Sequence, residues 1–427
     1  MSETAVSPTK KFFQQGFINL FGSAFASFLA FLFNFIVVKS LSVANYGEYT
    51  SAVAYVAILA TPLSILSLIV IKKVSSQPAT ERVAYAQKIM RQFLALLRKN
   101  WWLVFLVPIF WWWLSQKANF ADAFSTPTVI LLILASVLST LYTAILQGWQ
   151  LFHILSLLGI IIASVKLLLG GALLNWQPSL DLVYLTMLIT GFGQIFLYFC
   201  AIEKRSQRYK IARQQTKTTL KIWPYLRRRE ILVPLISTIS TTALINLDVI
   251  VVKMIANPDF AGEYGLYSLF AKILFYAGMP LVSVAFTFFN NPEEPQQQKK
   301  IFYFAGGLLS LFTLAMMIIY YFFPQILITI VGQVQYLGLS KVLWLAAIFG
   351  GLYCLVMLLS QYLVAKNRRL IYFSLLIPVL QAVGIYFYHG QAAEIMLVNI
   401  AVCLILLIAY TVGIIGKRNW RARKQNA

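Results

Sequence analysis

The sequence predicts an all-α membrane protein with about twelve transmembrane helices, arranged as two six-helix lobes around a central cavity. Three observations support this prediction: the composition, the length of the apolar runs and an internal repeat. Of the 427 residues, 60% are hydrophobic and only 11% are charged, whereas a soluble domain carries about 25% charged residues. Apolar runs of about 20 residues recur from Gly16 to Gly416, and each is long enough to cross a hydrocarbon core of about 30 Å. The composition therefore excludes a soluble enzyme, a secreted disulfide scaffold and a disordered chain.

The expected spans follow the apolar runs in order. The first run, from Gly16 to about Val38, follows two lysines but has no A-x-A cleavage site, so we expect a retained span rather than a signal peptide. The third is short and centres on Pro108, between tryptophan clusters that suit the two membrane interfaces. The twelve expected spans are 16–38, 49–71, 100–115, 128–147, 154–174, 182–202, 231–254, 264–289, 301–322, 341–365, 370–387 and 394–416.

The basic residues give the orientation. The net charge is +22, with 35 Lys and Arg against 13 Asp and Glu. If both termini are cytoplasmic, the cytoplasmic segments hold 29 of the 35 basic residues. This asymmetry is the positive-inside pattern, and it supports an even number of spans. The positive charge is therefore a topology signal, and we expect no nucleic-acid partner.

Two cytoplasmic segments are longer than simple connections. Residues 80–99 place apolar side chains at helical spacing among basic ones, which predicts either a helix lying on the membrane surface or an extension of the third span. Residues 203–230 are strongly basic and separate six spans from six. We expect an N-terminal lobe at 1–202, a linker at 203–230, a C-terminal lobe at 231–416 and a basic cytoplasmic tail at 417–427.

The two halves repeat each other. Ile36–Lys39 and Tyr46–Tyr49 in the first half match Ile250–Lys253 and Phe260–Tyr264 in the second, at offsets of 214 and 215 residues. A proline in the second span and a Ser-Leu-Leu sequence in the fifth span of each half recur at an offset of 218. Six spans preserve the orientation of the chain, so the copies are parallel repeats. Such repeats place a substrate route between the halves and suit alternating access.

These residues resemble a known family. The Gly-Glu-Tyr turn that follows the first span and recurs after the seventh is similar to that of the Wzx-type polysaccharide-export flippases. The segments Gln147–Phe152, Phe323–Leu327 and Val331–Gly332 share this resemblance, which covers nearly the whole chain. The family belongs to the multidrug/oligosaccharidyl-lipid/polysaccharide exporter superfamily. The resemblance implies a flippase in the bacterial cytoplasmic membrane that moves a polyprenyl-diphosphate-linked oligosaccharide, with membrane lipids and other polysaccharide-assembly proteins as partners.

Polar residues inside the spans are the candidate substrate-binding residues. A charge at mid-helix costs about 2.5–3.5 kcal/mol on insertion scales, so it normally faces a cavity or a partner. A lipid-linked diphosphate needs cationic partners, whereas an aspartate can pair with a lysine or carry a coupling proton or sodium ion. Asparagines continue one polar helical face on the first and seventh spans, where helix packing is an equal alternative. The candidates are Lys166, Lys272, Asp248, Asn34, Lys39, Lys253, Asn19 and Asn246.

Other functions have less support from the sequence. A glycan polymerase or ligase needs a charged external loop, but the longest external segment, 323–340, has no charged residue. No D-x-D motif and no CxxC or CxxH spacing occurs, so we expect no enzyme, no metal site and no resident cofactor. A multidrug cation exporter of the same superfamily is the closer alternative, and it needs acids in its cavity. A non-transporting scaffold does not need two buried lysines.

Overall fold

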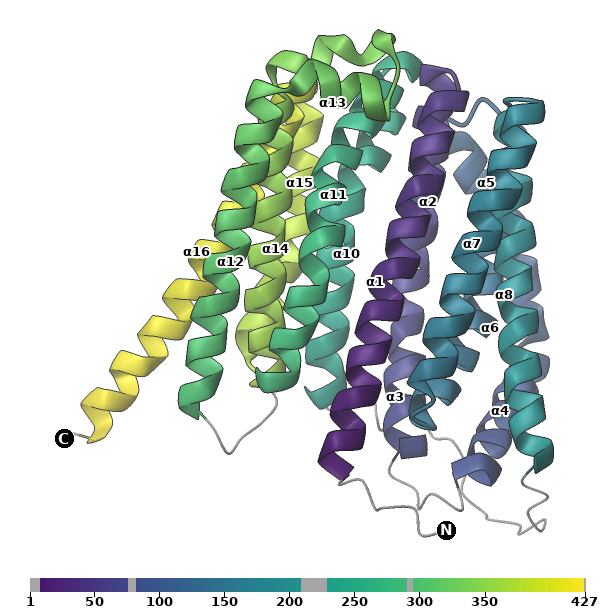
Figure 1. Cartoon of the computed structure of the whole chain (residues 1–427), viewed down its shortest axis with the longest axis vertical. Coiled ribbons are helices and arrows are strands. Elements are labelled where there is room, and N and C mark those ends of the chain that lie inside the picture. Colours follow the sequence, from purple (N-terminus) through teal and green to yellow (C-terminus); the bar gives the residue numbers. More distant parts are fainter. Residues whose placement is uncertain (1–7, 76–81, 209–228, 290–294, 426–427) are drawn as a thin grey trace. The chain divides into compact units, whose positions relative to one another are not determined.

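A computed structural model describes residues 8–75, 82–208, 229–289 and 295–425 of the chain (Figure 1). These residues form helices joined by short connections, and none of them forms a β-strand. Ten of the helices are long and apolar enough to cross a membrane. The all-α polytopic fold that the sequence predicts is therefore confirmed.

The helices agree closely with the apolar runs. In the first half they are α1 (Pro8–Ser40), α2 (Val43–Ala60), α3 (Ser64–Ser75), α4 (Arg82–Lys99), α5 (Leu106–Lys117), α6 (Ser125–Gly148), α7 (Phe152–Trp176) and α8 (Leu180–Arg208). In the second half they are α10 (Arg229–Ile255), α11 (Pro258–Phe289), α12 (Pro295–Phe322), α13 (Pro324–Val331), α14 (Leu343–Ala365), α15 (Ile377–Phe387) and α16 (Ala392–Gln425). Four short 3₁₀ segments complete the set: η1 (Thr61–Leu63), η2 (Trp101–Phe105), η3 (Val334–Lys341) and η4 (Arg369–Leu376).

Three of the predicted spans contain a 3₁₀ segment, and in the eleventh, 370–387, η4 leads directly into α15. The second, 49–71, consists of α2 and α3 with the 3₁₀ turn η1 between them. Pro62 lies in η1, and a proline inside a helix removes one backbone hydrogen bond and clashes with the preceding turn. The third, 100–115, consists of η2 followed by the short helix α5. Hydropathy located the three apolar segments but not these 3₁₀ segments.

The chain forms two compact units. Unit 1 comprises residues 1–40 and 62–227, and unit 2 comprises residues 41–61 and 228–427. In unit 1, α1 packs along α7, with the Phe33 ring in the space that Gly170 leaves open. A second core joins α3, α4 and α6 through apolar side chains such as Val74, Ile89 and Ile145. Each helix therefore buries one face against its neighbours inside the unit.

Residues 82–99 of the predicted segment 80–99 form helix α4. It is separate from α5, because η2 lies between the two helices. Its apolar side chains Val83, Ala86 and Ile89 are buried against α3 and α6. The indole of Trp149 donates a hydrogen bond to the carbonyl of Arg82 (3.1 Å). The apolar side chains described in the first half of α4 are therefore covered by protein, and both roles, a helix on the membrane surface and an extension of the third span, stay predictions.

Unit 2 is built around α14. This helix packs against α11, α12 and α16, and most of its length is buried. Glycines allow the close approach, because a Cβ on Gly350 would collide with the α11 backbone at Ala271 and one on Gly351 with Thr313 of α12. Close helix contact through small residues is the usual way in which membrane helices associate. Helix α14 is therefore the centre of this unit.

Helix α2 belongs to unit 2, although it lies in the first half of the sequence. It packs on α10 and α11, and a Cβ on Gly47 or Gly262 would collide with the backbone of the facing helix. The predicted lobe boundary at residues 1–202 thus differs from the compact units at this helix. Most of the predicted linker, 209–228, lies outside the described residues.

The starts of α2 and α11 correspond to each other in the repeat. Each helix follows its predecessor after two residues, Leu41–Ser42 in one case and 256–257 in the other. The Ser42 hydroxyl accepts a hydrogen bond from the backbone N–H of Asn45 (3.3 Å), and the Asn257 side chain accepts one from Phe260 (2.7 Å). Both are N-cap bonds, which satisfy free donors at a helix start. The repeated Gly-Glu-Tyr sequences therefore lie in the second turns of two capped helices.

We expect Gly262→Ala to destabilise unit 2. The new methyl group would collide with the carbonyl of Val43 on α2, and overpacking of this kind costs about 1–3 kcal/mol. Gly307→Ala is the matched control, because a Cβ at Gly307 on α12 meets no atom within 4 Å. Thermal unfolding of the detergent-solubilised protein should give a lower Tm for Gly262→Ala than for Gly307→Ala. Equal Tm values would show that the α2–α11 contact is not tight.

Candidate functional site

Asp248 is fully buried in α10. Its Oδ2 atom accepts hydrogen bonds from the Tyr264 hydroxyl (2.7 Å) and the Asn399 amide (3.1 Å). The Asn399 amide also lies 2.9 Å from the Tyr264 oxygen. Because the three residues belong to α10, α11 and α16, one carboxylate connects three helices of unit 2.

Gln381 extends this network to α15. Its side-chain amide donates to Asn399 Oδ1 (2.8 Å) and to the carbonyl of Leu244 on α10 (2.8 Å). Gln381 and Asn399 are both fully buried. A buried polar group without a hydrogen bond costs about 1–3 kcal/mol, so these bonds stabilise the packing of α10, α15 and α16.

Two acceptor atoms of the network have no hydrogen-bond partner among the described residues: Asp248 Oδ1 and Gln381 Oε1. Lys272 on α11 adds an attractive charge–charge interaction with Asp248. No ion pair within 4.0 Å joins Asp248 and Lys272 among the described residues, so their pairing stays a prediction. The network combines a negative charge, a nearby positive charge and unused oxygen atoms inside apolar helices.

Lys253 lies in a second buried polar contact. Its Nζ is 3.8 Å from Oε2 of Glu48 on α2, and the two side chains are only 1% and 2% exposed. From the sequence, Glu48 was expected in the turn before the second span, outside the membrane-spanning residues. Helix α2 begins at Val43, so Glu48 is a buried helical residue and a second embedded acid.

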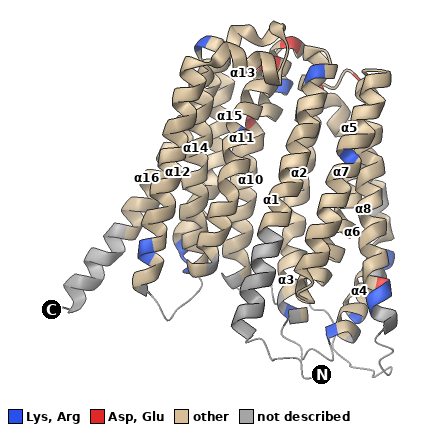
Figure 2. Cartoon of the chain, viewed as in Figure 1, with Lys and Arg blue, Asp and Glu red and all other residues tan. Residues whose placement is uncertain are grey.

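Lys166 lies midway along α7 in unit 1 and is half-buried. Its Nζ is 4.6 Å from the centre of the Phe33 ring on α1, a cation–π contact. Gly170, one helical turn further along α7, leaves the space that this ring occupies. No acidic side chain in the described part of the chain forms an ion pair with Lys166. Most other charged residues lie near helix ends (Figure 2).

The asparagines of the polar faces bond to their own helices. The amide of Asn34 donates to the carbonyl of Ala30 (3.0 Å), and that of Asn246 donates to the carbonyl of Thr242 (2.9 Å). Lys39 is exposed, and its Nζ is 4.5 Å from the centre of the Phe35 ring. The side chain of Asn19 lies outside the described residues. A role in substrate binding stays a prediction for all of these residues.

The sequence analysis missed Glu48, Tyr264, Gln381 and Asn399. Gln381 and Asn399 carried the signal that singled out Asn246, since each is an isolated amide in an apolar run. Tyr264 lies in the repeated Gly-Glu-Tyr sequence, but a tyrosine near a span end is common and gave no reason to connect it with Asp248. Only the packing of α10 against α11 and α16 brings these residues together.

We expect the Glu48–Lys253 pair to show strong coupling in a double-mutant cycle. Glu48→Gln or Lys253→Met alone leaves a buried charge without its counter-charge, which costs about 3–5 kcal/mol. The double variant removes both charges, so its loss of unfolding free energy should be smaller than the sum of the two single losses. Denaturant unfolding of the purified protein measures these energies. Additive losses would contradict a coupled pair.

Comparisons with known proteins agree with this architecture. No protein-family model and no curated sequence matches the chain. Among solved structures, the lipid II flippase MurJ in an inward closed conformation gives a TM-score of 0.68 at 12% identity, covering 93% of this chain and 87% of that chain. An inward-facing multidrug resistance MATE family transporter of the MOP superfamily gives 0.65 at 14% identity, covering 93% and 96%. A eukaryotic MATE transporter gives 0.62 at 11% identity, covering 96% and 98%. The chain therefore has the fold that these MATE transporters share with MurJ.

Proposed function

We propose that the protein is an alternating-access flippase of the bacterial cytoplasmic membrane. Its substrate is a polyprenyl-diphosphate-linked oligosaccharide, the repeat unit of a surface polysaccharide, which moves from the inner to the outer leaflet. The main support is the fold, which over 93% of the chain is similar to both a lipid II flippase and a multidrug transporter. The repeated sequence motifs and the positive charge of the embedded lysines favour the lipid flippase over the multidrug transporter.

Alternating access needs two bodies joined by segments that bend. The chain passes between unit 1 and unit 2 next to Ser40, at Thr61–Pro62 and near residue 227. The first passage lies in the link between α1 and α2, and the second lies in η1. A 3₁₀ turn with proline is a common place for a helix to change direction. We assign the bending during transport to these two short connections.

The embedded charge of unit 1 favours an anionic cargo. The acids in the described part of unit 1 are Asp122, Asp181 and Glu203, and all lie near helix ends. Lys166 lies at mid-helix, where its ammonium group lies over the Phe33 ring. A diphosphate is a strong partner for an ammonium group in a low-dielectric cavity. A cationic drug would be repelled there.

The Asp248 network is our candidate site for the coupling cation. Asp248 Oδ1 and Gln381 Oε1 are buried acceptors without hydrogen-bond donors in the described structure. Hard cations such as Na⁺ prefer oxygen atoms, and a proton would satisfy the carboxylate directly. Lys272 can balance the charge of Asp248 when the cation has left. Binding of a proton or sodium ion would therefore compete with the attraction between Asp248 and Lys272.

A multidrug cation exporter is the second candidate. The MATE structures with a fold similar to this chain favour it, and so does Asp248, an embedded acid of the kind that binds cations. The complete burial of Asp248 and its hydrogen bond from Tyr264 argue against a site open to a drug-sized cation. The two candidate functions differ in the charge of the cargo, which is negative for the lipid-linked oligosaccharide and positive for a drug. A genetic experiment can distinguish the two functions.

Deleting the gene should remove surface polysaccharide and cause lipid-linked repeat units to accumulate on the cytoplasmic leaflet. The flippase acts after assembly of the repeat unit and before its polymerisation outside, so its substrate has no other route. Surface staining together with extraction of lipid-linked oligosaccharides measures both effects. Normal surface glycan combined with increased sensitivity to cationic dyes would instead support the drug exporter.

Lys166→Gln and Lys272→Gln should each reduce transport at least about tenfold while leaving membrane insertion intact. Each change removes an embedded cation whose insertion cost of about 2.5–3.5 kcal/mol is otherwise offset by a partner or the cargo. Lys→Arg should retain part of the activity, since it keeps the charge but changes its shape. Lys300→Gln on the exposed start of α12 is the control. Wild-type transport by both Gln variants, normalised to inserted protein, would show that these lysines are packing residues.

A further inference from the structure

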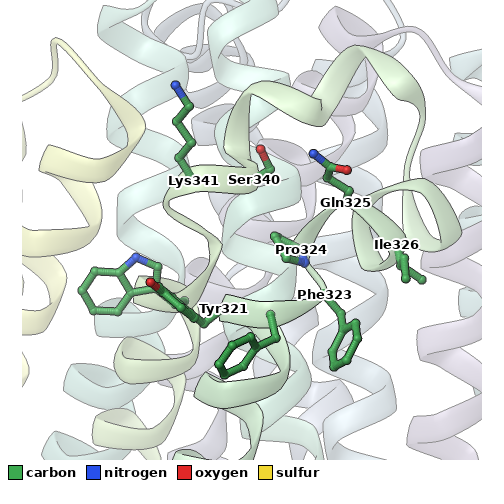
Figure 3. A pocket seen from close by; sticks show the side chains of 9 residues that line it. Tyr321, Phe323, Pro324, Gln325, Ile326, Ser340 and Lys341 are labelled. Atoms are coloured by element: carbon green, nitrogen blue, oxygen red, sulfur yellow. The ribbon is translucent and has the colours of Figure 1, made fainter.

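A cavity of about 480 Å³ lies in unit 2, where α12 ends and α14 begins (Figure 3). Its volume is within the range of about 300–1,000 Å³ that small-molecule sites occupy. The walls come from the end of α12, the start of α13, the end of η3 and the start of α14. The polar and aromatic side chains that line the cavity and are used below are Tyr321, Phe323, Gln325, Ser340, Lys341 and Trp344.

The cavity has a polar side and an aromatic side. Figure 3 shows the ammonium group of Lys341, the Ser340 hydroxyl and the Gln325 amide on one side, and the rings of Tyr321 and Phe323 on the other. Lysine, serine and glutamine side chains all supply hydrogen-bond donors that suit a phosphate. The lining contains one basic residue and no acid, so its net charge is positive.

The aromatic side continues into an apolar stripe on α12. Leu311, Leu314, Ile318 and Phe322 are spaced by three or four residues and are 63%, 49%, 46% and 67% exposed. This spacing places them on one face of the helix. Eleven residues of helix span about 16 Å, close to half of a hydrocarbon core of about 30 Å. The stripe therefore has the length of one acyl chain, and it begins at the cavity.

We propose that this cavity binds the head group of an anionic membrane phospholipid. Lys341, Ser340 and Gln325 bind the phosphate, and an acyl chain lies along the exposed stripe of α12. Tyr321 and Trp344 lie where the chain meets the head group, the position at which such rings are enriched in membrane proteins. The combination of donors, one positive charge and an adjoining acyl-length stripe suits a lipid better than a soluble anion. The proposal does not depend on the transport function.

Native mass spectrometry of the full-length protein, titrated with phosphatidylglycerol or phosphatidylcholine in mild detergent, tests it. The wild type should bind one phosphatidylglycerol in preference to phosphatidylcholine, and Lys341→Gln should bind phosphatidylglycerol about fivefold more weakly. Lys341→Arg should keep most of the preference, because the charge remains. The matched control is Lys117→Gln, since Lys117 is an exposed lysine at the end of α5 near exposed tryptophans but does not line this cavity.

Three results would overturn the proposal. Equal binding of the two lipids by the wild type would mean that the cavity does not select an anionic head group. An equal loss in Lys117→Gln would mean that the lysines attract lipid only through general surface charge. Displacement of phosphatidylglycerol by millimolar inorganic phosphate would mean that the cavity binds a free anion and that the acyl stripe contributes nothing.

Discussion

A carboxylate enclosed by apolar helices must find its hydrogen-bond donors inside the protein, and Asp248 is such a group. Its donors come from Tyr264 and Asn399, and Gln381 holds Asn399 in place. These residues lie on α10, α11, α15 and α16, so satisfying one charge fixes the relative positions of four helices. Apolar packing alone would leave such helices free to slide, because lipid tails are as apolar as leucine side chains. The polar network therefore specifies how unit 2 is assembled.

The same constraint explains why α2 packs in unit 2. Glu48 cannot face lipid without a large cost, and Lys253 provides its counter-charge in a contact that is almost fully buried. Gly47 and Gly262 allow α2 to approach α11 closely, next to the contact of Glu48 with Lys253 on α10. The repeated Gly-Glu-Tyr sequence thus has two different roles. One copy supplies the buried Glu48, and the other supplies Tyr264, which donates a hydrogen bond to Asp248.

Much of this architecture could be predicted from the sequence, because hydropathy and the distribution of basic residues are local properties. Hydropathy predicted the positions of nearly all the helices, whereas the roles of Asp248 and Lys272 in transport stay predictions. The breaks at η1 and η2, the assignment of α2 to unit 2 and the burial of Glu48 did not follow from these local properties. These depend on contacts between residues far apart in the chain, such as Asp248 with Asn399. A periodic pattern shows which face of a helix is polar, but it does not identify the helix that this face meets.

We expect this membrane protein, with cationic groups inside its spans, to carry an anionic lipid-linked cargo. The most direct measurement is a flipping assay in proteoliposomes that contain the purified protein and a fluorescent polyprenyl-diphosphate oligosaccharide. An impermeant quencher reports how much of the lipid reaches the outer leaflet. The account predicts protein-dependent flipping of the diphosphate lipid and no transport of a cationic dye by the same vesicles. Transport of the dye without flipping of the lipid would contradict it.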